Sequence, residues 1–182
     1  IDMAGVNSYK SGVISGLYKG LQGLIKSRKI TVVEGWGRLV GPDTIEVNGQ
    51  RLTGKNIVLA TGSYSRSLPG LAIEGRVMTS EHALTMEHVP ASAIILGGGV
   101  IGSEFASVWK SFGSEVTIIE GLPNLVPNED VAISKNLERA FRKRGIKFNL
   151  GDRFAGVTQD DQGVHVTLES GKTFDAEVLL VA

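Results

Sequence analysis

The chain has 182 residues, of which 42% are hydrophobic, so it is long enough to bury a core in one domain or in two small ones. Its 19 basic and 19 acidic residues cancel, which argues against a broad charged surface for nucleic acid or for an anionic membrane. Cysteine is absent, which removes disulfides, cysteine zinc sites and thiol redox chemistry from this chain, and no apolar run is long enough to span a bilayer.

The first part of the chain predicts a long helix followed by a small antiparallel meander. Apolar residues between positions 8 and 28 recur at helical spacing and share one face of the helix: Val13, Leu17, Leu21, Leu24 and Ile25. Residues 30–34 and 44–47 predict strands, and the Asn48-Gly49 pair after the second strand is a strong signal for a two-residue hairpin turn.

A continuous apolar run then predicts one buried strand before the chain crosses to a second region. Residues 57–60 form this run, which ends at Thr61-Gly62. Leu68-Pro69-Gly70 breaks the pattern, and the mixed stretch up to Pro90 predicts a crossover that holds a short helix at residues 80–86.

From Ser92 onward, predicted strands and helices alternate, which indicates a parallel sheet. The predicted strands cover residues 93–96, 116–120 and 146–150, and the predicted helices cover residues 103–112 and 130–144, the second capped by Gly145. Residues 154–168 and 172–182 predict an antiparallel excursion followed by a further buried strand.

The motif with the strongest functional signal runs from Gly97 to Gly102 and fits the pattern G-x-G-x-x-G. It follows a predicted strand, opens a predicted helix and precedes Glu120, which ends the next strand about 20 residues on, as dinucleotide-binding sites require. The first glycine permits the tight turn, Gly99 lets a pyrophosphate approach the backbone, and the last glycine lets the helix pack closely on the strand. The alternative is a glycine turn that binds nothing.

Glu120 also favours NAD over NADP. Its carboxylate can accept hydrogen bonds from the ribose hydroxyls of an adenosine, whereas it would repel a 2′-phosphate. Residues 121–128 contain no arginine or lysine that could accommodate such a phosphate. We therefore expect the chain to prefer NAD.

The segments IVLATGS, IILGGGVIGSEFASVWKSFG and VTIIE, in this order, resemble the class I pyridine nucleotide–disulfide oxidoreductases, and among them the dihydrolipoamide dehydrogenases. The resemblance covers essentially the whole chain. It implies an α/β fold in which a Rossmann-like NAD-binding domain, made of a parallel sheet plus an antiparallel meander, joins the C-terminal part of an FAD-binding domain. The FAD-binding part would cover residues 1–68 and the NAD-binding domain residues 69–182. Both ends of the chain look cut, so we expect an internal segment that ends at the last strand of the NAD-binding domain.

The resemblance also assigns cofactor contacts to particular positions. It implies NAD contacts at Gly97, Gly98, Gly99, Val100, Ile101, Gly102, Ser103, Glu104, Glu120 and, through its backbone, Phe154. It implies FAD contacts at Gly37, Thr61, Gly62 and Ser63. Glu104 would lie near the nicotinamide, although a glutamate in the first turn of a helix is also favoured by the helix dipole alone. The redox-active cysteine pair and the catalytic His-Glu pair of the family have no counterpart here, so we expect no catalytic residue and no activity in this chain alone.

For the whole protein, the resemblance implies oxidation of dihydrolipoamide through a disulfide and FAD, with hydride passed to NAD. The implied partners are a lipoyl-bearing protein of a 2-oxo acid dehydrogenase complex and a second copy of the protein in a homodimer, without metal, nucleic acid or membrane. The implied compartment is the cytoplasm in a bacterium or the mitochondrial matrix in a eukaryote. Two alternatives stay open, namely another NAD(P)H–disulfide reductase of the same superfamily and a non-catalytic NAD-binding module.

Overall fold

The computed structural model describes residues 1–182 and forms two compact units. One unit contains residues 65–182 together with residues 1–7, and the other contains residues 8–64. Helix α1 covers Met3–Ser27 and buries none of its residues. No helix in the structure combines the length and the apolar character needed to cross a membrane.

The unit formed by residues 8–64 contains a three-stranded antiparallel sheet. Its strands are β1 (Arg38–Leu39), β2 (Thr44–Val47) and β3 (Gln50–Thr53), in that spatial order. Asn48 and Gly49 both have positive φ, at 50° and 79°, which is the backbone that a two-residue hairpin of type I′ requires. The predicted strand at residues 44–47 and the predicted hairpin turn are therefore confirmed.

Two strand predictions in this unit are wrong. Residues 30–34 and residues 57–60 form no strand, and in the second segment Val58 and Leu59 are 84% and 72% exposed. A strand needs a neighbour to satisfy its N–H and C=O groups, and neither segment has one in this structure. The helix predicted over residues 8–28 is confirmed, but its apolar face is exposed, with Leu17 at 72%.

The larger unit is built on a five-stranded sheet in which every pair is parallel. The strand order is β4–β11–β5–β6–β7, with bounds Val77–Thr79, Val178–Val181, Ser92–Leu96, Glu115–Glu120 and Lys147–Leu150. Its helices are α2 (Ser80–Ala83), α3 (Val100–Phe112) and α4 (Val131–Lys143). The predicted parallel sheet is confirmed, whereas the edge strand β4 lies in the stretch that the sequence pattern predicts only as a crossover.

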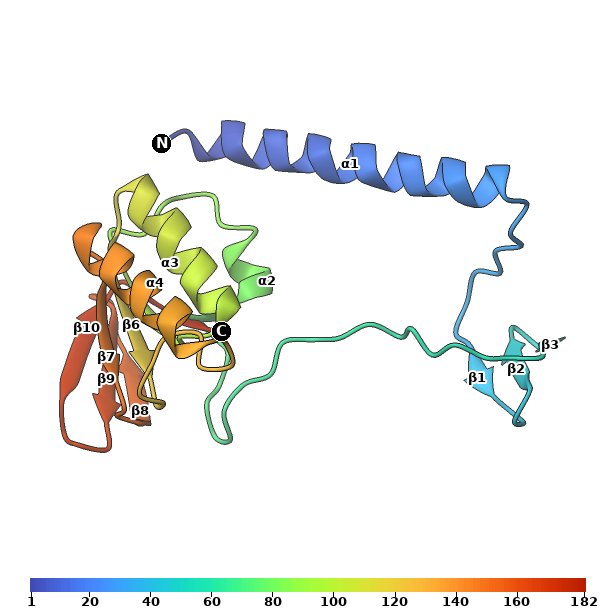
Figure 1. Ribbon diagram of the computed structural model, residues 1–182. Coiled ribbons are helices and arrows are strands. Elements are labelled where there is room, and N and C mark those ends of the chain that lie inside the picture. The colour runs from blue at the N-terminus through green and yellow to red at the C-terminus, as the bar shows by residue number, and fades with distance from the viewer. The chain divides into compact units, whose positions relative to one another are not determined.

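A second sheet covers one face of the parallel sheet, and helices cover the other (Figure 1). The second sheet is antiparallel and consists of β8 (Phe154–Gln159), β9 (Val164–Leu168) and β10 (Thr173–Ala176). Side chains of the central strands alternate between the two faces. Ile95, Ile118 and Leu180 pack with Trp109 of α3 and Phe141 of α4, whereas Ile94, Ile119 and Leu179 pack with Val164 and Val166 of β9.

The order of connections places a topological switch point beside β5. The chain leaves β5 through α3 and reaches β6 on one side, and it returns through β8, β9 and β10 to β11 on the other side. In open parallel sheets, ligands bind outside the carboxyl ends of the strands at such a point. The carboxyl ends of β5, β6 and β11 therefore define the region where a binding site is expected.

Candidate functional site

The glycine-rich turn between β5 and α3 is shaped by close backbone contacts. Gly97 has a φ of 113°, and a Cβ built there would collide with the carbonyl oxygen of Ala182, which follows β11. A Cβ at Gly102, in the first turn of α3, would collide with the carbonyl oxygen of Gly97. Gly99 is different, because a Cβ there would meet nothing within 4 Å. The first and last glycines are thus required by the protein itself, whereas Gly99 faces open space.

Unpaired amides point out of the start of α3. The first hydrogen bond of the helix is the one that the Ser103 N–H donates to the Gly99 carbonyl oxygen, at 3.0 Å. The preceding amides of the helix, at residues 100–102, have no partner in the protein. The carbonyl oxygen of Gly98 is turned aside, because it accepts a hydrogen bond from the Val126 N–H at 2.7 Å. Free N–H groups and the positive end of the helix dipole together favour an anion such as a phosphate at this position.

Glu120, at the end of β6, is held against the glycine-rich turn by its side chain. Its Oε2 accepts a hydrogen bond from the Gly98 N–H at 2.7 Å, and its Oε1 accepts one from the Leu122 N–H at 2.8 Å. These two bonds fix the carboxylate at the edge of the sheet. The acid and the glycine-rich turn, which are 22 residues apart in the sequence, therefore form one structural unit.

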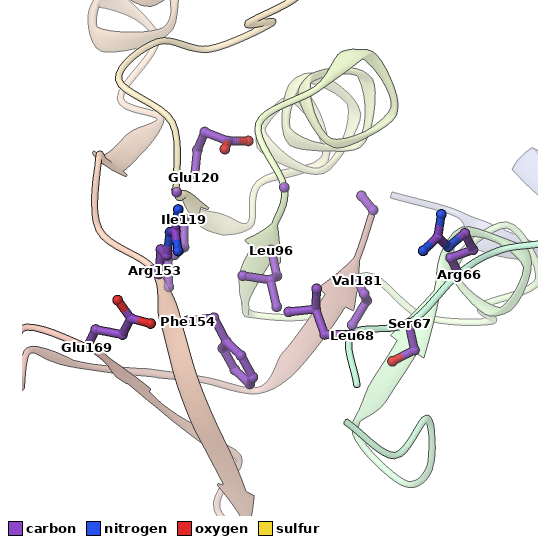
Figure 2. Close-up of a pocket in the computed structure, with 13 residues that line it drawn as sticks. Arg66, Ser67, Leu68, Leu96, Ile119, Glu120, Arg153, Phe154, Glu169 and Val181 are labelled. Carbon is purple, nitrogen blue, oxygen red and sulfur yellow. The ribbon is translucent and has the colours of Figure 1, made fainter. Parts of the chain in front are cut away.

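A cavity of about 430 Å³ opens at this edge of the sheet (Figure 2). Its walls come from the ends of β5, β6 and β11, from the start of β8 and from the segment that precedes β4: Arg66, Ser67, Leu68, Leu96, Gly97, Ile119, Glu120, Gly121, Arg153, Phe154, Glu169, Val181 and Ala182. Figure 2 shows Glu120 and Arg153 on one side of the cavity and Arg66 on the opposite side. The cavity has the size and the position of a site for a small organic ligand.

The structure brings several of the predicted NAD residues together at this cavity, but not all of them. Gly97, Glu120 and Phe154 line it. Gly99 and Val100 line a separate recess of about 30 Å³ beside residues 126–129. Within α3, Ser103 is buried, and Glu104 is exposed and lines neither space.

Three charged residues of the cavity have no counterpart in the sequence-based predictions, namely Arg66, Arg153 and Glu169. Arg153 lies directly before Phe154, so its place beside the predicted adenine contact could have been inferred. Arg66 and Glu169 are far from the glycine motif in the sequence, and only the packing of the chain brings them to the cavity.

The predicted FAD residues lie in the smaller unit. Gly37 precedes β1, and a Cβ there would lie 3.4 Å from Cγ2 of Ile45. Thr61, Gly62 and Ser63 belong to no helix or strand and are exposed. No hydrogen bond joins Gly37 to these three residues, so the structure does not enclose a flavin site within residues 8–64.

A histidine outside the cavity forms a compact ionic cluster on the second sheet. His165 of β9 lies between two carboxylates, with Nδ1 2.8 Å from Oδ1 of Asp175 and Nε2 3.1 Å from Oδ2 of Asp160. The hydrogen bonds to Asp175 and Asp160 raise the pKa of His165 above its ordinary value. The cluster joins β9 to β10 and to the turn after β8, so its role in this structure is to hold the second sheet together.

The comparison with curated proteins gives relatives that match almost the whole of this chain. The mitochondrial dihydrolipoyl dehydrogenase of Pisum sativum is 38% identical over 100% of this chain and 38% of its own length. The dihydrolipoyl dehydrogenase of Bacillus subtilis is 39% identical over 97% of this chain and 41% of its own length. The leghemoglobin reductase of Vigna unguiculata is 38% identical over 98% of this chain and 35% of its own length. The chain thus spans between 35% and 41% of the length of these relatives.

Solved structures share the fold over the whole chain. The HOCl-induced flavoprotein disulfide reductase from Escherichia coli has a TM-score of 0.85 and 28% identity, and the match covers 100% of this chain and 42% of that one. LpdA from Mycobacterium tuberculosis has a TM-score of 0.88 at 24% identity, which supports the fold alone.

The family comparison matches residues 2–182 to the pyridine nucleotide-disulphide oxidoreductases. Proteins of this family and the dihydrolipoyl dehydrogenases use FAD and NAD(H). The resemblance inferred from the glycine-rich motif and its flanking segments is therefore confirmed. The chain belongs to the pyridine nucleotide-disulphide oxidoreductase family.

Proposed function

We propose that residues 69–182 bind NAD(H) at the carboxyl edge of the parallel sheet. The observation that carries the proposal is the arrangement of the glycine-rich turn, in which unpaired amides of α3 face open space at Gly99 while the carboxylate of Glu120 is fixed beside them. A pyrophosphate would lie at the start of α3, and the adenosine ribose would lie against Glu120. The adenine would contact the backbone of Phe154, which lines the same cavity as Glu120.

The residues of the site fit the nucleotide in charge as well as in shape. The start of α3 offers N–H donors to an anion, and Glu120 offers acceptors to the two ribose hydroxyls. Ser103 would support the turn from behind, because its Oγ lies 3.5 Å from the Gly98 carbonyl oxygen. Val100 and Ile101 would contribute through their backbone, whereas Gly98 would contribute by holding the Glu120 carboxylate with its N–H. Glu104 would lie near the nicotinamide. Because α3 begins at Val100, Glu104 lies just beyond the first turn of the helix, on its exposed side, and not within the first turn as the sequence pattern predicts.

For residues 1–68 we propose a part of an FAD-binding domain, with contacts at Gly37 and at residues 61–63. Support for this proposal comes from the family, whose members use FAD. The smaller unit does not enclose a flavin site by itself, so its geometry adds no support of its own. Bound FAD would supply the two-electron transfer between a dithiol and the nicotinamide. The part of this chain in that reaction is to bind NAD and to orient it.

The whole protein, in this proposal, oxidises dihydrolipoamide and passes hydride to NAD. Its partners are a lipoyl-bearing protein of a 2-oxo acid dehydrogenase complex and a second copy of itself. It would act in the cytoplasm of a bacterium or in the mitochondrial matrix of a eukaryote. A second candidate is a reductase of the same family with another substrate, because the leghemoglobin reductase of Vigna unguiculata is as similar to this chain, at 38%, as the pea dihydrolipoyl dehydrogenase.

Two measurements test these proposals separately. Calorimetric titration of the 182-residue chain should give tighter binding for NADH than for NADPH, and binding of neither nucleotide would contradict the proposed site. Steady-state assays of the whole protein should show NAD reduction with dihydrolipoamide at a higher kcat/KM than with other dithiols. A higher value with another electron donor would favour the second candidate.

A further inference from the structure

The carboxylate of Glu120 occupies a position that is built to hold an anion. Both of its oxygens accept hydrogen bonds from backbone N–H groups, Oε2 from Gly98 at 2.7 Å and Oε1 from Leu122 at 2.8 Å. Pairs of backbone amides that converge in this way are the groups with which proteins bind phosphate and other anions. In this chain the anion that they hold is a side chain of the protein itself.

An arginine lies beside this position. A Cβ at Gly121, the residue after Glu120, would lie 3.3 Å from Cγ of Arg153, so the stem of Arg153 passes against the backbone there. Arg153 lines the same cavity as Glu120, and Figure 2 shows both on the same wall. The absence of a side chain at Gly121 is what gives Arg153 this room.

The guanidinium group of Arg153 forms no hydrogen bond or ion pair with the protein. Three other arginines of the larger unit are engaged: Arg76 with the carbonyl oxygen of Asp161, Arg142 with Glu138, and Arg144 with Ser107 and Ser111. Arg66, at the opposite side of the cavity, and Arg139, on the exposed face of α4, form no hydrogen bond or ion pair either. Glu169 also lines the cavity, but its contact with Arg153 is a backbone one, in which its N–H donates to the Arg153 carbonyl oxygen at 2.8 Å. A cation without a partner at the wall of a cavity is available to a ligand.

We infer that Arg153 and the two amides held by Glu120 form a latent site for a phosphate on the adenosine ribose, closed to that phosphate by the Glu120 carboxylate alone. The inference rests on the proposed binding of NAD(H) in this cavity. While Glu120 is present, its charge repels a phosphate dianion and its oxygens occupy the amides. Without it, the N–H groups of Gly98 and Leu122 and the Arg153 guanidinium can all donate to the phosphate, as charge-assisted hydrogen bonds. Arg153 is therefore a specificity-determining residue, and one substitution should exchange the preferred nucleotide.

The test is a calorimetric titration of the 182-residue chain with NADH and with NADPH. The wild type should prefer NADH. Glu120→Ala should weaken NADH binding and reverse the preference, with NADPH bound about tenfold more tightly than NADH or better. Adding Arg153→Met to Glu120→Ala should remove the gain in NADPH binding. Adding Arg139→Met instead, which deletes the same charge from the exposed face of α4, should leave the gain intact.

Each outcome separates the inference from the proposed function. If the wild type binds neither nucleotide, the proposed function fails. If the wild type binds NADH but Glu120→Ala still prefers NADH, the latent site does not exist. If Arg66→Met removes the gain as completely as Arg153→Met, the cavity recognises the phosphate by its overall charge and the role given to Arg153 is wrong. Circular dichroism and thermal unfolding check each variant, and Glu120→Gln, which keeps the shape of the side chain, replaces Glu120→Ala if the latter does not fold. In Glu120→Gln the preference for NADH over NADPH should then be smaller than in the wild type, and an unchanged ratio of the two affinities would overturn the inference.

Discussion

Replacing Gly99 with valine should abolish nucleotide binding while the fold survives. Gly99 is the N-cap of α3, with φ −69° and ψ −167°, an extended backbone that valine adopts readily. A Cβ at this position meets no protein atom within 4 Å, so the two methyl groups of valine would extend into the open space in front of the helix. That space is where we propose that the pyrophosphate lies.

The expected changes in folding stability and in nucleotide affinity follow from the extended backbone of Gly99 and from the open space in front of it. Valine is a poorer N-cap than glycine by roughly 0.5–1 kcal/mol, and the loss of backbone freedom in the unfolded chain offsets this by about 0.4–1 kcal/mol. The thermal midpoint should therefore move by no more than about 4 °C. The ligand would lose at least two charge-assisted hydrogen bonds, each worth about 1.5–3 kcal/mol, so its affinity should fall by more than about 100-fold.

The assay is calorimetric titration with NADH, combined with thermal unfolding followed by circular dichroism. Gly16→Val in α1 is the matched control, because a Cβ there also meets nothing within 4 Å and the position is remote in sequence from the glycine motif. Gly102→Ala should instead destabilise the fold, because its Cβ would collide with the Gly97 carbonyl oxygen. Binding of NADH to a folded Gly99→Val chain at wild-type affinity would show that the glycine-rich turn is only structural.

Three further predictions follow from the structure. The purified 182-residue chain should carry no stoichiometric flavin, because residues 61–63 are exposed and enclose no cavity, and a yellow chain with a flavin absorption spectrum would refute this. Because the pKa of His165 is raised, its ion pairs with Asp175 and Asp160 stabilise the fold fully below about pH 6.5, and this stabilisation is lost as pH rises through the raised pKa, so the thermal midpoint of the wild type should fall over that range. His165→Gln should lack this fall, and identical pH profiles for the two proteins would contradict the account. Leu180→Ala, at a side chain that is 0% exposed in the central strand β11, should lower the free energy of unfolding by about 2–5 kcal/mol in urea titration, and a loss below about 1 kcal/mol would show that β11 is not part of the core.

The pattern of the sequence predicts most of the parallel sheet and its helices well, because the necessary signals are local. Apolar runs of strand length, separated by helices with caps, define β5, α3, β6 and α4 within a few residues. The distance of Glu120 from the glycine motif predicts that the two lie together, and in the structure the Gly98 N–H donates a hydrogen bond to Glu120. The Asn48-Gly49 pair likewise specifies its own hairpin.

The predictions fail where a segment depends on partners that are distant in the sequence. Residues 30–34 and 57–60 have the apolar, β-branched composition of strands, but no neighbouring strand pairs with them in this structure. Strand β4 is only three residues long, and its parallel pairing with β11, about 100 residues later, leaves no local pattern. Arg66 and Glu169 reach the cavity through the same kind of long-range packing, so composition and spacing give no indication of them.

The central claim is that this chain holds NAD(H) between the start of α3 and Glu120. Titration of the ¹⁵N-labelled chain with NAD, followed by amide chemical shifts, tests it most directly. We expect the largest shifts at the amides of Gly99–Ser103, at Leu122 and at Phe154, and little change in α4 or β10. Saturable binding whose shifts lie outside this set, or no shift at millimolar NAD, would contradict the account.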